Sequence, residues 1–418
     1  MSISDLSAYE ILDSRGNPTV YCELVFGENS VSSSVPSGAS TGAKEALELR
    51  DNINNRYNGK GVKRAVSNIN NIIKKELIGK EINQKEIDDL LIKLDGTENK
   101  SKLGANAILA VSMCICKALA KINNKEIYEN VSSDEKVEIP ICLMNILNGG
   151  MHTKSGVDIQ EFMIIPVVKS VNERVRIGAE IFHKLGDILI KKGYSAGIGD
   201  EGGYAPKLVS NTLALDLIVE AINKAGYNPG KDVFIGLDVA ANSLYDEKTK
   251  TYKLDNTNMN KDELLNYYKF LINKYPIISI EDPFYEDDFE SLKKMTSLLG
   301  NKIMIVGDDY FVTNKKYLEK GIKNNAANAI LLKPNQIGTI SEMLETIKLA
   351  KENNYRTIIS HRSGETTDTL IADLAVGLNL GFIKTGSLSR GERVCKYNRL
   401  MIIENKLLGR KKELWKDL

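Results

Sequence analysis

Three consecutive short apolar runs in the second half of the chain each end on a carboxylate. Asp238 closes "FIGLD", Glu281 closes "ISIE" and Asp308 follows "IVG". A single acid after a strand is usually a helix cap or a turn residue. Three acids at one edge would repel one another without a cation between them, and oxygen ligands without Cys or His suit a hard ion such as Mg²⁺. The pattern therefore predicts a metal site made by these three carboxylates.

The next three apolar runs end in cationic or titratable side chains. Lys333 closes "AILLK", His361 and Arg362 follow "TIIS", and Lys384 closes "FIK". The planar guanidinium of Arg362 suits phosphate or carboxylate, and Ser363 would add a hydroxyl donor. A plain polar loop is the alternative interpretation of "HRSGE". Taken together, the runs predict an anion site beside the metal site.

Lys333 allows two interpretations. Its stem could cover apolar surface while the ammonium reaches water, which is the ordinary behaviour of a lysine at a strand end. Alternatively, a dry position beside other cations would lower the pKa of its amine and make it a base. This segment alone leaves both open.

Glycine-flanked polar residues occur earlier in the chain, in the motifs "NGGMH", "QEF" and "GDEGGYAP". They contain His152, Gln160, Glu161 and Glu201. Glycine lets a backbone approach a ligand closely, so these residues are candidates for the same site. Further upstream, the small-residue loop at about 36–43 is either a flexible surface loop or a lid over that site.

The elements that position these residues fall into two parts. Residues 1–130 combine a predicted antiparallel meander, up to about residue 36, with helical patterns from Ala43 to about Lys125, which indicates a small α+β domain. From 137 to 418 apolar runs alternate with amphipathic stretches, as in βα units around a parallel sheet. A closed barrel and a doubly wound open sheet share this pattern, and the chemistry at the strand ends favours the barrel. The predicted strands are "ICLMNIL", "EFMIIPV", "YSAGIGD", "VFIGLD", "IISIED", "IMIVGD", "AILLK", "RTIISH" and "GFIKTG".

Composition narrows the class of protein. The 418 residues carry 56 Lys and Arg against 55 Asp and Glu, so nothing in the charge indicates a nucleic-acid partner. The N-terminus has no basic stretch followed by an apolar core, and no apolar run approaches the roughly 20 residues that cross a bilayer. The five cysteines are scattered and odd in number, which predicts reduced core residues. We expect a cytoplasmic protein.

The motifs together resemble those of the enolase family. The resemblance runs in order and with matching spacing through nearly the whole chain, from "EILDSRGNPTV" through "SGASTGAKEALELRD", "LGANAILAVS", "GDEGGYAP", "SIEDPF" and "SHRSGET" to "IKTGS". It implies an α+β domain on a TIM-like βα barrel whose first units are irregular, with an antiparallel start. A homodimer or an assembly of dimers is implied in the same way.

The resemblance also implies a role for each matching position. Asp238, Glu281 and Asp308 correspond to ligands of a first Mg²⁺, and Ser40 to a residue that helps to hold a second Mg²⁺ bound with substrate. Lys333 corresponds to the base and Glu201 to the general acid. The remaining matches are the phosphate-binding pair Arg362 and Ser363, and the substrate contacts His152, Gln160, Glu161, His361 and Lys384.

The implied reaction is the reversible dehydration of 2-phospho-D-glycerate to phosphoenolpyruvate, a step of glycolysis and gluconeogenesis. It requires Glu201 to be protonated, which predicts a pKa raised by burial or by Glu161. Two alternatives are a superfamily member that acts on a non-phosphorylated acid, which "SHRSGE" disfavours, and a catalytically idle binding protein, which the retained Lys333 and Glu201 disfavour.

The sequence departs from the family pattern at a few places. They are the loop Thr153–Val157, Asn242 and Ser243 after Asp238, Tyr285 after "EDPF", and Pro334 after Lys333. None of them removes a predicted site residue.

Overall fold

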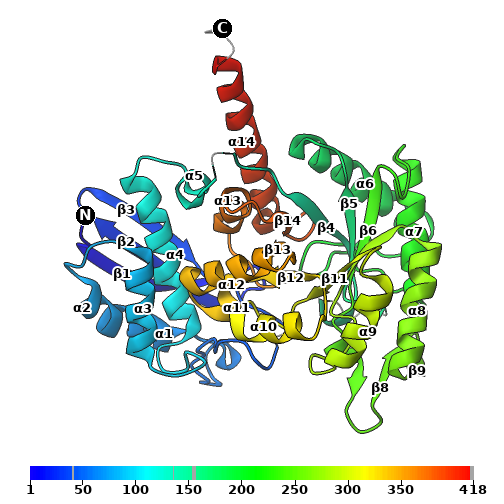
Figure 1. Cartoon of the computed structure of the whole chain (residues 1–418), viewed down its shortest axis with the longest axis horizontal. Coiled ribbons are helices and arrows are strands. Elements are labelled where there is room, and N and C mark those ends of the chain that lie inside the picture. The colour runs from blue at the N-terminus through cyan, green and yellow to red at the C-terminus, as the bar shows by residue number, and fades with distance from the viewer. Residues whose placement is uncertain (40–41, 135, 153–156, 415–418) are drawn as a thin grey trace.

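The computed structural model describes residues 1–39, 42–134, 136–152 and 157–414, and for residues 410–414 the backbone alone. The N-terminal domain lies beside a barrel, and the C-terminal end of the last helix projects away from both (Figure 1). This confirms the predicted fold class, an α+β domain followed by a βα barrel.

The N-terminal domain is built on an antiparallel meander. Strand β2 pairs with β1 on one side and β3 on the other, as the turns in the sequence predicted. Alternate residues of β2, from Val20 to Phe26, are buried under helix α4. The helices begin later than predicted, because residues 43–56 contain none. The bounds are β1 Asp5–Leu12, β2 Pro18–Phe26, β3 Asn29–Ser34, η1 Tyr57–Gly59, α1 Lys63–Asn68, η2 Ile69–Ile73, α2 Lys74–Leu77, α3 Gln84–Asp95, α4 Ala105–Ile122 and α5 Ile127–Val131.

Helix α4 is the central helix of this domain. Its 18 residues contain no Gly or Pro, and most of them are buried. Among the described residues it is the one helix long and apolar enough to cross a membrane, although the sequence analysis expected no such run. Its burial against β2 and β3 is that of a core helix.

The second domain contains a closed eight-stranded barrel, so the open sheet is excluded. Around the barrel the strand order is β10-β11-β12-β13-β14-β4-β5-β6. Strand β5 runs antiparallel to both of its neighbours, which is the irregular start that the family resemblance implied. The bounds are β4 Ile141–Asn148, β5 Glu161–Pro166, β6 Val233–Asp238, β10 Ile277–Glu281, β11 Met304–Gly307, β12 Ala329–Leu332, β13 Arg356–Ser360 and β14 Gly381–Lys384.

One predicted strand, "YSAGIGD" at 194–200, is wrong. This segment is a loop that forms a single bridge, between Ile198 and Tyr204. Gly197 and Gly199 weaken a strand because they add backbone freedom and no side chain to pack. The chain then returns at Tyr204, whose backbone bonds to Ile146 and Asn148 of β4, and Glu201 is thereby brought toward the barrel mouth.

The helices and the remaining short elements surround the barrel, whose interior is filled by apolar side chains such as Met163, Val306 and Leu331. Most of these helices begin at a capping residue, for example Ser210 before α7 and Thr339 before α12. The bounds are η3 Gly150–His152, α6 Val171–Lys191, α7 Asn211–Lys224, η4 Ala241–Leu244, β7 Tyr245–Asp246, β8 Thr251–Leu254, β9 Thr257–Met259, α8 Lys261–Lys274, α9 Phe289–Leu299, α10 Lys315–Lys323, α11 Pro334–Ile337, α12 Ile340–Glu352, α13 Leu370–Gly377 and α14 Gly391–Leu414.

Hydrogen bonds fix the N-terminal domain to the mouth of the barrel. The backbones of Ser37 and Gly364 exchange two bonds, of 2.7 and 2.8 Å. Farther from the mouth, the buried Asp88 accepts bonds from the backbone and hydroxyl of Ser341. The segment around residue 37 is thereby held at the mouth.

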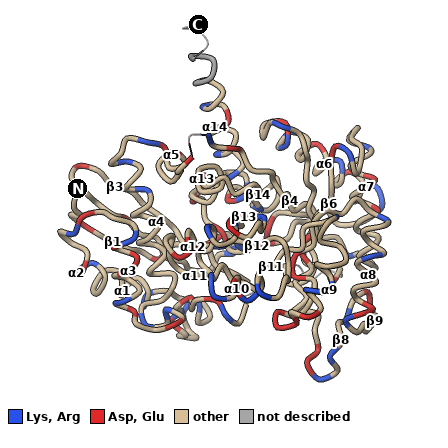
Figure 2. The backbone as a smooth tube through the Cα atoms, viewed as in Figure 1, with Lys and Arg blue, Asp and Glu red and all other residues tan. Residues whose placement is uncertain are grey.

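Charged residues of both signs are interspersed along both domains (Figure 2). This distribution agrees with the formal net charge of +1. The charged residues that bear on function are concentrated inside the barrel mouth.

Candidate active site

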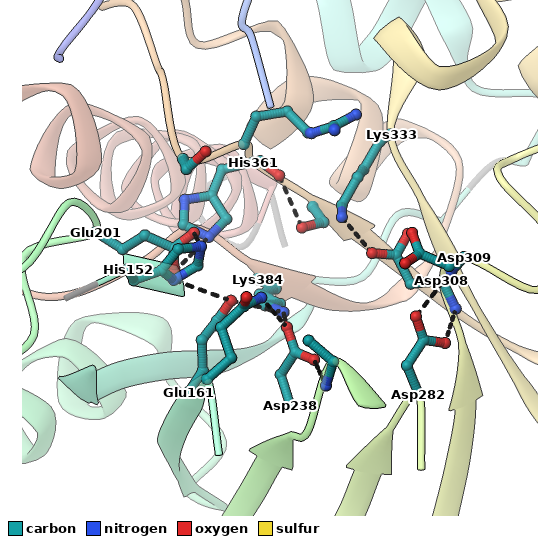
Figure 3. A pocket seen from close by; sticks show the side chains of 15 residues that line it. His152, Glu161, Glu201, Asp238, Asp282, Asp308, Asp309, Lys333, His361 and Lys384 are labelled. Carbon is teal, nitrogen blue, oxygen red and sulfur yellow. Dashed lines mark hydrogen bonds and ion pairs between the residues drawn. The ribbon is translucent and has the colours of Figure 1, made fainter. Parts of the chain in front are cut away.

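The carboxyl ends of the barrel strands surround a small cavity lined mostly by polar and charged side chains (Figure 3). Strands β6, β10 and β14 end on Asp238, Glu281 and Lys384, whereas Asp308 and Lys333 follow β11 and β12 directly. The lining consists of His152, Gln160, Glu161, Glu201, Asp238, Ala240, Asp282, Asp308, Asp309, Lys333, Ser360, His361, Arg362, Ser363 and Lys384.

The reversed strand β5 explains why two predicted residues at a strand start reach the same mouth. Because β5 is antiparallel to its neighbours, its first residue, Glu161, lies opposite Asp238 at the end of β6. Gln160 is held there by its backbone N–H, which donates to the carbonyl oxygen of Asp238 at 3.0 Å.

Lys384 joins three buried carboxylates. Its ammonium lies 2.8 Å from Glu281, 3.1 Å from Asp238 and 3.1 Å from Glu161. Burial lowers the pKa of Lys384, but the three carboxylates outweigh burial and raise it well above the usual value. Burial and the neighbouring Asp238 raise the pKa of Glu281 well above its usual value. The chain itself thus supplies a cation between two of the predicted metal ligands.

The third predicted ligand, Asp308, lies in a different group. It forms an ion pair with Lys333 and accepts a bond of 2.8 Å from Gln336. Asp282 accepts the backbone N–H groups of Asp308 and Asp309 at 2.8 and 2.9 Å, which gathers three acids. Burial and the charge of Asp308 raise the pKa of Asp309 to about 7.

Lys333 lies at the strand end with its ammonium in the cavity, so the interpretation that it reaches out to water is not supported. Its side chain is 12% exposed. The expected lowering of its pKa is wrong for the chain alone. Burial lowers the pKa of Lys333, but the paired Asp308 carboxylate overcomes this, and the net direction is upward.

The residue types fit a hard cation. Six acids and three Lys or Arg residues line the cavity, and oxygens of Gln160 and Glu161 are buried without a hydrogen-bond partner among the described residues. A surplus of buried carboxylates is a typical setting for a divalent ion. Within the described residues, potential ligand atoms gather most closely in Asp282, Asp308 and Asp309 and in His152, Glu161 and Glu201. Ser40, the other predicted ligand, lies outside the described residues.

Glu201 is buried between two histidines. Its carboxylate lies 3.6 Å from Nε2 of His152 and 3.5 Å from Nε2 of His361, and it accepts a bond of 2.9 Å from Asn145. The predicted raised pKa is wrong for the chain alone. Burial raises the pKa of Glu201, but the two imidazoles and Arg393 lower it, and the net direction is well below the usual value. Burial and Glu201 instead raise the pKa of Glu161 well above its usual value.

The predicted phosphate pair also lies at the mouth. Arg362 is buried, and its guanidinium donates to Glu45 at 2.9 and 3.2 Å and to Asn335 at 3.1 Å. The hydroxyl of Ser363 is buried and has no hydrogen-bond partner among the described residues. Glu45 follows the predicted lid loop, so this ion pair connects the two domains at the proposed anion position.

The departures from the family pattern find structural roles. Pro334 is the first residue of α11, a position where its missing N–H costs no bond. Asn242 donates to Asp309 at 2.8 Å and accepts the backbone N–H of Glu286 at 2.9 Å. Tyr285 stacks on Tyr245 with ring centroids 4.6 Å apart. Of the departing loop, only Val157 is described, and it is buried.

Sequence reasoning missed several residues that contact this site. Asp282 and Asp309 directly follow two predicted ligands, so the doublets "ED" and "DD" were an available signal. Asn145 lies inside an apolar strand, where no local pattern indicates a site, and Arg393 lies in the segment "SRGER", to which the sequence analysis assigned no role. Glu45 was overlooked because its partner, Arg362, lies 317 residues away.

Comparison with known families assigns both domains. Residues 3–131 match the family model of the enolase N-terminal domain. Residues 136–414 match the family model of the enolase C-terminal TIM barrel domain.

Proposed function

The chain belongs to the enolase family, and we propose that it catalyses the reversible dehydration of 2-phospho-D-glycerate to phosphoenolpyruvate. The family implies a lyase-type enzyme. The observation that carries the finer assignment is that one cavity is lined by Lys333, Glu201 and Arg362. These residues supply a base, an acid and an anion site, which are the groups that this reaction needs.

Lys333 and Glu201 have separate roles in this proposal. Lys333 takes the proton from the carbon next to the substrate carboxylate. Glu201 gives a proton to the departing hydroxyl. They come from different elements, the end of β12 and the loop before Tyr204, and Figure 3 shows them on different sides of the cavity. This separation allows one group to act on each of two neighbouring carbons.

The pKa shifts in the chain without substrate indicate which protonation states must change when substrate binds. Lys333 must lose its proton before it acts, so its ion pair with Asp308 must weaken. Glu201 must gain a proton, so the positive neighbours that lower its pKa must be offset. The first change follows if Asp308 becomes engaged with a bound cation, and the second if the negative charge of the bound substrate raises the pKa of Glu201.

Asp238, Glu281 and Asp308 would hold Mg²⁺, with Ser40 at a second ion that arrives with the substrate. Bound Mg²⁺ would neutralise the negative charge that develops on the substrate carboxylate, the role described generally for enolase-superfamily sites. The chain's own cationic and polar side chains then bind the other groups of the substrate. Arg362 and Ser363 bind the phosphate, and Lys384 and the neutral amide of Gln160 face the carboxylate side.

Absorbance of phosphoenolpyruvate tests the proposal. Purified protein given 2-phosphoglycerate and Mg²⁺ should produce the absorbance increase of phosphoenolpyruvate. A folded, metal-loaded protein that gives no increase would contradict the assignment. Turnover of a non-phosphorylated 2-hydroxy acid in its place would support the superfamily alternative, and binding without turnover would support the idle one.

Family membership also leads us to propose a homodimer or an assembly of dimers in the cytoplasm. Sedimentation velocity of the purified chain measures the first, and fractionation of the source cells measures the second.

A further inference from the structure

Arg393 is a fully buried arginine on α14 that contacts the candidate site from behind. One of its terminal nitrogens donates to Nδ1 of His361 and to the carbonyl oxygen of Arg362, both at 2.5 Å. The other donates to the carbonyl oxygens of Ser363 at 2.6 Å and Asp200 at 3.1 Å. A single guanidinium therefore joins three consecutive residues of "HRS" to the residue before Glu201.

The bond to His361 determines where the imidazole carries its proton. Arginine stays protonated in proteins and has no acceptor, so it can only donate. Nδ1 of His361 must then be the acceptor and carry no hydrogen. In a neutral imidazole the hydrogen is consequently on Nε2, because the bond made by one ring nitrogen fixes the state of the other.

The surroundings of His361 also keep it neutral. Burial and the positive charge of Arg393 lower the pKa of His361, to about 4, although Glu201 and Glu365 act in the opposite direction. The ring is held in place as well, because a Cβ added at Gly386 would lie 2.9 Å from Cε1 of His361 and 2.8 Å from Arg393.

The free end of the ring faces the acid. Nε2 of His361 lies 3.5 Å from Glu201, at the limit of hydrogen-bond distance, and makes no closer hydrogen bond among the described residues. A hydrogen on this nitrogen is therefore available to an oxygen that enters the cavity beside Glu201. The same hydrogen prevents Nε2 from accepting a proton.

We propose that Arg393 is a positioning residue that locks His361 in the tautomer with its hydrogen on Nε2. His361 then acts as a neutral hydrogen-bond donor to a substrate oxygen on the Glu201 side, and it cannot serve as the base in place of Lys333. The identity of that oxygen rests on the proposed function, whereas the tautomer does not.

Nitrogen-15 NMR of the full-length protein tests the lock, because the chain has only three histidines. Protein labelled with ¹⁵N-histidine would be recorded in long-range ¹H–¹⁵N correlation spectra between about pH 6 and pH 8, a range that spans the ordinary histidine pKa. The His361 signals are assigned by their loss in His361→Gln. We expect a neutral ring with hydrogen on Nε2 throughout this range.

Two variants separate the effect of Arg393 on the His361 ring from the general effect of replacing an arginine on α14. Arg393→Met should release the ring, so that both tautomers, or an imidazolium near the lower pH, appear at His361. Arg399→Met is the matched control, because Arg399 lies on the same helix and pairs with Glu126 and Asp373 without contacting His361. It should leave the His361 signals unchanged.

The wild-type spectrum decides the tautomer even if Arg393→Met fails to fold. Hydrogen on Nδ1, or an imidazolium at about pH 7, where an ordinary histidine is mostly neutral, would overturn the proposal. Unchanged His361 signals in folded Arg393→Met would overturn the role of the arginine. The spectra need no turnover, so an absent phosphoenolpyruvate signal with the expected tautomer would refute the proposed function alone.

Discussion

At the scale of single residues, charge balance decides what each side chain of the cavity can do. Lys384 and Lys333 are both paired with carboxylates, and Asp308 raises the pKa of its neighbour Asp309. In the chain alone, without a bound metal ion, two pKa shifts run opposite to the directions expected from the sequence, since Asp308 raises the pKa of Lys333 and the imidazoles lower that of Glu201. A sequence contains the residue types, but not the pairing that sets their protonation.

Mg²⁺ should raise the melting temperature of the metal-free protein more at about pH 8 than at about pH 5.5, because carboxylate ligands must lose their protons to bind metal. The pKa of Glu281 is raised in the fold, so its contribution to stability is lost as pH rises from the unfolded value through the folded one. Differential scanning fluorimetry measures the shift. Asp308→Asn should reduce it, and a shift of equal size at both pH values would contradict this reasoning.

Glu45 accepts hydrogen bonds from both terminal nitrogens of Arg362, which a phosphate would also need. Glu45→Gln should therefore tighten binding of inorganic phosphate by about tenfold, which corresponds to about 1.4 kcal/mol. Isothermal titration calorimetry measures the affinity, and the exposed Glu290→Gln serves as the control. Weaker binding in Glu45→Gln would show that the carboxylate orients Arg362 rather than competing for it.

At the scale of elements, the barrel follows from the sequence while the geometry of its rim does not. Eight of the nine predicted strands are present, because their short apolar runs are bounded by turn residues. The exception, 194–200, is an apolar run interrupted by glycines that serves as a loop to position Glu201. The antiparallel direction of β5 was expected only from the family resemblance. The alternation of apolar runs and amphipathic stretches does not specify the direction of a strand.

Helix η4 shows how a departure from the family pattern is accommodated. Asn242 bridges Asp309 and the backbone of Glu286, so Asn242→Ala should lower the free energy of unfolding by about 2 kcal/mol through two lost hydrogen bonds. Urea denaturation measures this value. Asn258→Ala, at an exposed position of β9, should change it by less than about 0.5 kcal/mol. Equal losses of unfolding free energy in the two variants would show that the hydrogen bonds of Asn242 do not stabilise the fold.

At the scale of the whole molecule, the two domains meet where the chemistry is proposed. The exchange of bonds between Ser37 and Gly364 holds the N-terminal domain beside Arg362. A Cβ at Gly364 would collide with the carboxylate of Asp13 and lie 2.8 Å from Arg15. This close approach was invisible in the sequence, because the two segments are more than three hundred residues apart.

Gly364→Ala should therefore force the domains apart at this contact. We expect the free energy of unfolding to fall by about 1–3 kcal/mol, as in other overpacked sites, and the KM for 2-phosphoglycerate to rise. Thermal unfolding and steady-state kinetics measure the two effects. Gly391→Ala is the control, because a Cβ there meets nothing within 4 Å. An unchanged KM in a destabilised Gly364→Ala variant would show that this domain contact does not affect substrate binding.

The central claim, that Lys333 is the base and Glu201 the acid of one dehydration, is tested most directly by exchange of the substrate's alpha proton with deuterated solvent. The exchange is followed by NMR of 2-phosphoglycerate with wild type, Glu201→Gln, Lys333→Ala and Lys333→Arg. Glu201→Gln should lose dehydration but keep exchange, whereas both Lys333 variants should lose both, because an alanine and a permanently protonated guanidinium cannot accept the proton. Near-normal exchange in Lys333→Arg, or loss of exchange in Glu201→Gln that still binds Mg²⁺ and substrate, would contradict the account.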